Sequence, residues 1–370
     1  MKKENVSLYH LIVVSVFIGI LLTCALFFLI HSALGREHTV AAQCFDGSEI
    51  RGDGFWSEFR RSVYQNTALQ ERIHETRYQL FGIVGEESVL AGKDDFLFEV
   101  SDEKSEYSFL QDYLGGVSFT EEEMQGILEL LNKRDRLYAE RGAEYLLVIL
   151  PNAQSVYSEN MPAHFGDIRE TRLDRLERYL LANGFTDFAN LTDEMISYKS
   201  QGRLYNNTEN SLNALGLYYT YLCVCERFQP TIMSKTRVTP RNDLKFYQHM
   251  TTGKAVARRA GLSDVVQNLT VSLSNNTKLN YHIQASTGRM TQTVLLPFEF
   301  SSNVNETPRL LLQFSNEWER LQAEPFFSNT FRGVTYQTDL ADDAAIYEQA
   351  DPDVVIQFLY EYQLSWLLPQ

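Results

Sequence analysis

Two polar stretches, each placed after a strand-like run, contain the residues of this sequence that could carry out chemistry. The first, Arg203–Gly216, reads RLYNNTENSLNALG: a short strand-like run, a polar turn and the start of an apolar helix. The turn contains a carboxylate at Glu209 and a hydroxyl at Ser211. Turns at strand ends are where α/β folds present catalytic and binding groups. The sequence therefore predicts a functional site around this turn.

The second stretch follows the apolar run Arg309–Phe314 and contains a serine at Ser315. A serine nucleophile needs a general base within hydrogen-bond reach and a group that orients the base. The base is most often a histidine, and the chain contains seven: His10, His31, His38, His74, His164, His249 and His282. A lone histidine is more often a packed or surface residue than a base. A relocated pair of Ser211 or Ser315 with one of the last three histidines is one hypothesis.

The first stretch resembles the active-site motif of the AlgX/AlgJ-like, DHHW-type SGNH hydrolase family. In that family a tyrosine precedes the pattern Asp-x-His-Trp-Asn-x-x-Gly, whose Asp and His serve a catalytic serine later in the chain. The framework positions match at Tyr205, Asn213 and Gly216. The reactive positions differ, because the Asp, His and Trp places are taken by Glu209, Ser211 and Leu212.

The family's nucleophile turn, Gly-Asp-Ser, falls in the second stretch. Alignment from the preceding strand places it on Ser315, Asn316 and Glu317, whereas alignment from downstream residues places it on Asn316, Glu317 and Trp318. Neither alignment supplies a serine nucleophile or the glycine that leaves room for a substrate oxyanion. A family lysine and a family aspartate are also replaced, by Ala153 and Lys254. The resemblance therefore implies a degenerate member.

Active members of the resembled family transfer or remove O-acetyl groups on exported polysaccharides beside a membrane-bound acyltransferase. The resemblance implies that this chain is a catalytically silent partner or sugar-binding module in such an assembly, without a cofactor or a metal. The side chains expected to contact sugar are Tyr157, Tyr205, Asn213 and Trp318. The alternative is an active polysaccharide O-acetyltransferase or acetylesterase with a rearranged site.

A pair of carboxylates suggests a third class of function. If the family fold is retained, Glu209 and Glu317 occupy places that normally touch one another. Two carboxylates facing each other across a sugar groove are the equipment of a glycosidase, and mutual repulsion raises the pKa of one of them. In the plainer interpretation both are solvated turn residues, and Glu209 stabilises the start of the following helix.

Alternating helix and buried-strand signals predict an α/β fold. Thr120 and Glu123 form the signature of a capping box, and Gly142 is a natural helix end. Residues 145–150 form a continuous apolar run, which is typical of a central parallel strand covered on both faces. This alternation continues to a strand predicted at residues 353–358.

By resemblance, residues 81–370 are expected to form an SGNH-hydrolase-like, three-layer α/β/α sandwich. Within that domain, residues 231–300 lose the helical periodicity and become rich in Thr, Ser and Asn. We expect this segment to be a β-rich insertion that covers the sheet edge as a lid or substrate wall.

The N-terminal part of the chain predicts a membrane anchor. Residues 11–33 contain no Lys, Arg, Asp or Glu, and such a helix is long enough to cross the hydrocarbon core of about 30 Å. Two lysines lie in residues 1–10, so the positive-inside rule places this end in the cytoplasm. Residues 34–80 are expected to be a juxtamembrane stalk and helix. The prediction is a single-pass cell-membrane protein with an extracytoplasmic domain.

The charge and cysteine content exclude other classes of function. The formal net charge is −15 and the pI is near 5.0, which argues against nucleic acid as a partner. The four cysteines form no Cys-x-x-Cys pair, and no histidine lies close to them in a zinc-ligand spacing.

Overall fold

The computed structural model describes most of the C-terminal four-fifths of the chain. The described residues are Gly19, Arg72, 75–80, 83–84, 86–101, 109–228, 238–274, 307–314, 322–331, 333–337, 347–348 and 350–368, with the backbone alone of 281–284, 298–302 and 317–321. The chain divides into a unit of residues 1–72 and a compact unit of residues 73–370. The predicted anchor at 11–33 lies outside the described residues except for Gly19, and no described helix is long and apolar enough to cross a membrane.

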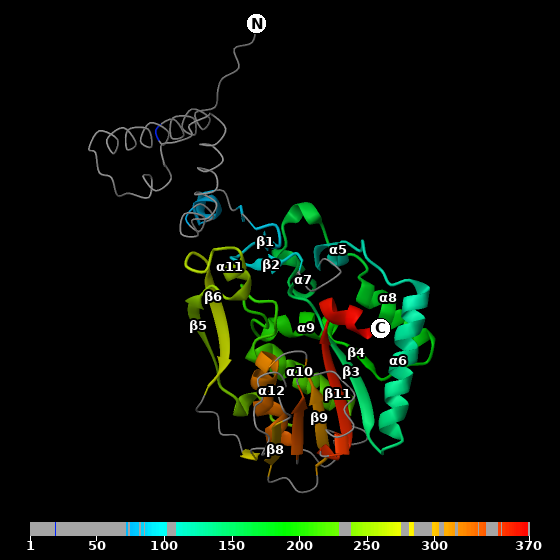
Figure 1. The fold of residues 1–370 in the computed structure, drawn as a ribbon. Helices are drawn as coiled ribbons and strands as arrows, with labels where there is room; N and C mark the ends of the chain where they lie inside the picture. The colour runs from blue at the N-terminus through cyan, green and yellow to red at the C-terminus, as the bar shows by residue number, and fades with distance from the viewer. Residues whose placement is uncertain are drawn as a thin grey trace, which may run out of the picture. The chain divides into compact units, whose positions relative to one another are not determined.

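A seven-stranded sheet forms the centre of the compact unit, in the order β4-β3-β11-β9-β10-β8-β7 (Figure 1). Its parallel strands are β3 (Glu144–Leu150), β4 (Phe188–Asn190), β9 (Arg309–Gln313), β10 (Gly333–Gln337) and β11 (Val354–Tyr360). Two antiparallel strands, β7 (Tyr281–Gln284) and β8 (Phe298–Ser302), extend the sheet beyond β10. The predicted parallel central sheet is confirmed.

Helices cover both faces of the sheet, which gives three layers. One face packs against α6 (Glu121–Ala139) and α8 (Arg172–Ala182). The other face packs against α9 (Thr192–Tyr198), α10 (Ala214–Arg227) and α12 (Glu317–Thr330). Smaller helices are α5 (Phe109–Tyr113), α7 (Ala153–Val156), α11 (Ala255–Arg259) and the 3-10 helix η6 (Glu361–Leu367). Further 3-10 turns are Ser158–Asn160, Ala163–Phe165, Lys199–Gln201 and Arg241–Asp243.

Local sequence signals account for these elements. The Thr120 hydroxyl accepts a hydrogen bond from the Glu123 amide at 3.2 Å, and the Glu123 carboxylate accepts one from the Thr120 amide at 2.7 Å, which starts α6 as predicted. After α6 the chain turns through Gly142 at φ 83°. In β3 every residue after Glu144 is buried, because helices lie over both faces of this strand.

Two hairpins lie outside the main sheet. The first pairs β1 (Val89–Ala91) with β2 (Leu97–Glu99), and its turn holds Asp94 and Asp95 at φ 55° and 60°. The second pairs β5 (Phe246–Thr252) with β6 (Gln267–Leu273). The segment predicted as a β-rich insertion therefore has two roles, since β5 and β6 form a separate hairpin whereas β7 and β8 join the central sheet.

Candidate functional site

The loop that joins residues 203 and 213 lies across the carboxyl ends of β3 and β11. The Tyr205 hydroxyl donates a hydrogen bond to the Pro151 carbonyl, directly after β3. The Leu212 amide donates to the hydroxyl of Tyr360, the last residue of β11, at 2.9 Å. Tyr205 and Leu212 also form an isolated antiparallel bridge, which closes the loop on itself. The first polar stretch therefore lies at the edge of the sheet where α/β proteins place their sites.

The polar side chains of this loop bind backbone groups of the fold. The Asn207 amide group donates to the carbonyls of Asp95 at 2.9 Å and Gln267 at 2.8 Å, and its oxygen accepts from the Leu269 amide at 2.7 Å. Asn207 is 3% exposed, so these bonds are shielded from water. The next residue, Thr208, is fully buried and donates its hydroxyl proton to a side chain of β6.

The neighbouring carboxylates and amides of the loop are paired as well. The Asn206 side chain donates to the Glu209 carboxylate, and its oxygen accepts from the Val271 amide of β6 at 3.2 Å. The Asn210 side chain donates to the Glu99 carboxylate, which also forms an ion pair with the guanidinium of Arg259. At the predicted site, the polar groups of residues 206–210 are thus used to fasten β2, β6 and α11 together.

Ser211 has no base within the described part of the molecule. Its side chain is half-buried, and no hydrogen bond joins its hydroxyl to another described residue. The two histidines with described side chains contact other rings: His164 lies against Phe165 in a tilted arrangement, at 4.1 Å between ring centroids, and His249 stacks on Tyr247 at 5.1 Å. The hypothesis of a relocated serine–histidine pair thus gains no support at this serine.

The second stretch is described only in part. Ser315 and Asn316 lie outside the described residues, and Glu317 and Trp318 are described by backbone alone, as the first residues of α12. The predicted carboxylate pair of Glu209 and Glu317 therefore stays a prediction.

The other residues predicted to contact sugar lie inside the fold. The Tyr157 hydroxyl accepts from the Leu204 amide at 2.9 Å, and burial raises the pKa of this phenol. Tyr205 is fully buried under the loop. Asn213 caps α10, because its oxygen accepts from the amides of Leu215 at 3.0 Å and Gly216 at 3.1 Å. These contacts give each residue a structural role, and sugar binding by them stays a prediction.

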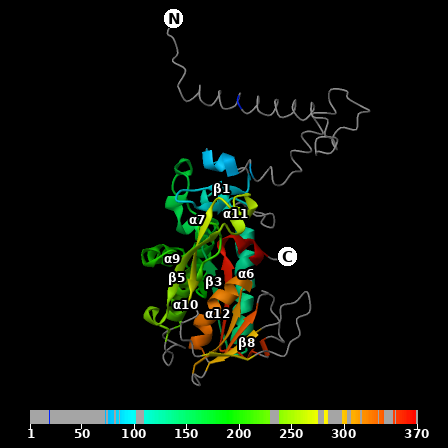
Figure 2. The same ribbon diagram turned by 90° about the vertical axis from the view of Figure 1, so that its left-hand side faces the viewer.

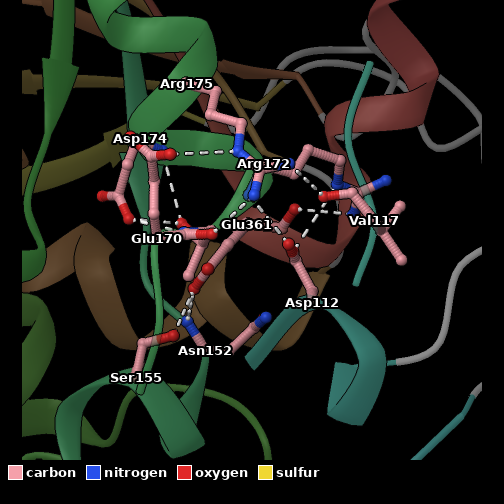
Figure 3. Close-up of polar contacts among 10 residues, drawn as sticks. Asp112, Val117, Asn152, Ser155, Glu170, Arg172, Asp174, Arg175 and Glu361 are labelled. Carbon is pink, nitrogen blue, oxygen red and sulfur yellow. Dashed lines mark hydrogen bonds and ion pairs between the residues drawn. The ribbon is translucent and has the colours of Figure 1, made fainter. Parts of the chain in front are cut away.

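A buried polar cluster lies beside the same sheet edge and was not predicted (Figure 3). Glu361 follows β11 directly, and its carboxyl oxygen accepts hydrogen bonds from the Asn152 amide at 2.9 Å and the Ser155 hydroxyl at 2.7 Å. Next to it, the Arg172 guanidinium lies 3.5 Å from the Asp112 carboxylate. All five residues are at most 4% exposed.

The cluster holds two carboxyl groups beside a single guanidinium. Arg172 lies against Asp112 and donates to the Glu361 backbone carbonyl at 3.4 Å. The two donors that the described residues offer to the Glu361 carboxyl are both neutral. Burial, followed by the nearby charge of Asp112, raises the pKa of Glu361 to about 7. Burial likewise raises the pKa of Asp112, against the opposing effect of Arg172. Glu361 therefore changes its protonation near neutral pH.

Comparisons with known proteins show which solved structures share this fold. No protein-family model and no curated protein matches the chain. Among solved structures, Bacillus cereus PatB1 with a sulfonyl adduct is similar at 13% identity, covering 76% of this chain and 96% of that one, with a TM-score of 0.54. The chain shares its fold with PatB1. At this identity the likeness shows the fold alone.

Two further solved structures are similar at lower scores. A DHHW family protein from Eubacterium siraeum is 12% identical over 67% of this chain and 86% of its own, with a TM-score of 0.49. The O-acetyltransferase domain of Pseudomonas putida AlgJ is 15% identical over 75% of this chain and 92% of its own, with a TM-score of 0.46. The likeness to PatB1 confirms the α/β fold that the resemblance implies, whereas the loss of the catalytic residues is not tested by it.

Replacing Asn207 by Ala is expected to destabilise the domain by about 2–4 kcal/mol, because two backbone carbonyls and one amide lose a shielded partner. The matched Ser211→Ala variant in the same loop should change the free energy of unfolding by less than about 0.5 kcal/mol. Urea denaturation of both variants measures the difference. Equal effects of the two substitutions would contradict the assigned roles.

Replacing Glu361 by Gln is expected to change how stability depends on pH. Because the pKa of Glu361 is about 7 in the fold against an ordinary 4.5, the folded state binds the extra proton, and the free energy of unfolding falls as pH rises between these values. The fall amounts to about 3 kcal/mol and is complete above neutral pH. Glu361→Gln should abolish this fall. The free energy of unfolding of the variant, relative to that of the wild type, should therefore rise from pH 5 to pH 8.

Denaturant titrations at several pH values between 5 and 8 measure this difference. The exposed Glu122→Gln on α6 serves as the matched control and should follow the wild type at every pH. A constant offset between Glu361→Gln and the wild type across the range would show that Glu361 does not take up the proton.

Proposed function

We propose that this chain is a catalytically silent, SGNH-hydrolase-like module that acts in the O-acetylation or assembly of an exported cell-envelope polysaccharide. The observation that supports the absence of catalysis is the hydrogen bonding of the side chains in the 203–213 loop. Where the resembled family has its Asp and His, the loop has Glu209 and Ser211, the first held by Asn206 and the second without a described base.

The biological setting rests on the resemblance and on the predicted anchor. The framework residues Tyr205, Asn213 and Gly216 and the fold shared with PatB1 support descent from this group of proteins. The apolar segment at 11–33 would hold the domain on the outer side of the cell membrane, beside a membrane-bound O-acyltransferase. The module would position the polysaccharide or the acyltransferase, while another protein transfers the acetyl group.

The full-length protein, solubilised in detergent, is expected to hydrolyse 4-nitrophenyl acetate no faster than its Ser211→Ala and Ser315→Ala variants. In a working serine enzyme, loss of the nucleophile lowers the rate by about 10⁴–10⁶, so the two outcomes are easily separated. Ser200→Ala, at an exposed serine, is the matched control. Turnover that either active-site substitution abolishes would instead establish an esterase or acetyltransferase with a rearranged site.

The same variants test the cellular role. In the native host, deletion of the gene should lower the O-acetyl content of the exported polysaccharide. Wild type and Ser211→Ala/Ser315→Ala should restore that content equally, since the module contributes no nucleophile. Unchanged O-acetyl content after deletion would overturn the proposed setting even if the protein has no hydrolase activity.

A further inference from the structure

The β5–β6 hairpin lies on the side of the unit that faces the viewer in Figure 2. One of its faces packs on the core at the Phe246 end of β5, whereas Met250 on the same face is 54% exposed. Phe246 on the inner face lies 5.9 Å from Tyr218, between ring centroids, in the main core. Side chains alternate along a strand, so Lys245, Tyr247 and His249 lie on the opposite, outer face. Tyr247 is 48% exposed, and its ring stacks on the His249 ring at an interplanar angle of 23°.

Hydroxyl groups surround this aromatic pair. Across the hairpin, Tyr247 is opposite Ser272 and His249 is opposite Thr270. The Thr270 hydroxyl lies 3.1 Å from that of Thr251, the next outer-face residue of β5. The outer face thus combines a half-exposed tyrosine ring, backed by the His249 ring, with hydroxyl groups. Aromatic rings and hydroxyls are the groups that bind a sugar ring and its hydroxyls.

The hairpin is also a basic region in an acidic protein. Residues 241–264 contain five Lys or Arg side chains and two Asp, whereas the whole chain has a net charge of −15. Lys245 precedes β5, and Lys254 and Arg258 follow it, so positive charge lies at both ends of the strand. Within the described part of the chain, no ion pair engages these three side chains. They are thus available to an anionic ligand.

The hairpin is fixed in place by the loop at the sheet edge. Asn206 and Asn207 accept hydrogen bonds from the Val271 and Leu269 amides of β6, on the side away from β5. The loop side chains therefore occupy that edge of β6, and the outer face of β5 is held as a rigid surface. Rigid presentation lowers the entropy cost of binding an extended ligand.

We infer that the outer face of β5, with its basic ends, binds an extended anionic polysaccharide. The sugar rings would stack on Tyr247 and His249 while acidic substituents pair with Lys245 at one end and Lys254 and Arg258 at the other. This inference rests on the proposed function, since it names the chemical class of the polysaccharide. The acidic groups could be uronate carboxylates or phosphodiesters, which share the negative charge that the basic ends recognise.

Affinity electrophoresis of the full-length protein in detergent distinguishes binding to uronate carboxylates from binding to phosphodiesters. Polygalacturonate supplies carboxylates, poly(glycerol phosphate) supplies phosphodiesters, and dextran is a neutral polymer. At least one anionic polymer should retard the protein, dextran should not, and added salt should weaken the retardation. The anionic polymer that retards more strongly identifies the acidic group.

Variants locate the binding surface. Lys245→Gln/Arg258→Gln should weaken binding about fivefold through the loss of two exposed charge pairs, and Tyr247→Ala should weaken it by about as much. The matched control is Lys133→Gln, at an exposed lysine on α6. All four side chains lie at the surface or are half-exposed, so folding is expected to persist and is checked by thermal unfolding.

Three results would overturn the inference: no retardation by either anionic polymer, equal retardation by dextran, or equal weakening by Lys133→Gln. The outcome is independent of the hydrolysis assay. Ester turnover together with binding that depends on Tyr247 would refute the silent-module proposal and leave the binding surface in place.

Discussion

The hydrogen bonds of the loop at residues 203–213 are the constraint on which the rest of this structure depends. Tyr205 and Leu212 tie the loop to the ends of β3 and β11, and the asparagines between them tie it to β2 and β6. Each bond replaces water in a buried place, so loss of a partner would expose the full desolvation cost. The same atoms cannot also serve a reacting substrate. The loop that the sequence singles out therefore has a structural role, and the proposed catalytic silence rests on it.

Much of the fold was predictable because its signals are local. The capping box of Thr120 and Glu123 and the turn at Gly142 fix the ends of α6 within a few residues. The apolar run of β3 signals a strand covered on both faces without reference to its neighbours. In each case the interactions that determine the element lie within one turn or one strand of the chain.

What the sequence did not predict depends on contacts between distant segments. In the sequence, nothing distinguishes Glu361 from other acidic residues that follow a strand. Its raised pKa arises from burial against residues about two hundred positions away. The insertion of β11 between β3 and β9 is equally non-local. The polar turn at residues 206–210 lies at the sheet edge, and its hydrogen-bond partners in β6 lie some sixty positions further along the chain. The periodicity and composition of a sequence do not predict contacts between such distant segments.

The most direct test of the account is the reactivity of the serines at the carboxyl edge of the sheet. The full-length protein would be treated with an aryl sulfonyl fluoride, and intact-mass and peptide mass spectrometry would locate any adduct. Because no described base activates Ser211 and the Ser155 hydroxyl is buried against Glu361, the account predicts no stoichiometric adduct. A single adduct formed rapidly at Ser155, Ser211 or Ser315 would reveal an activated nucleophile and contradict it.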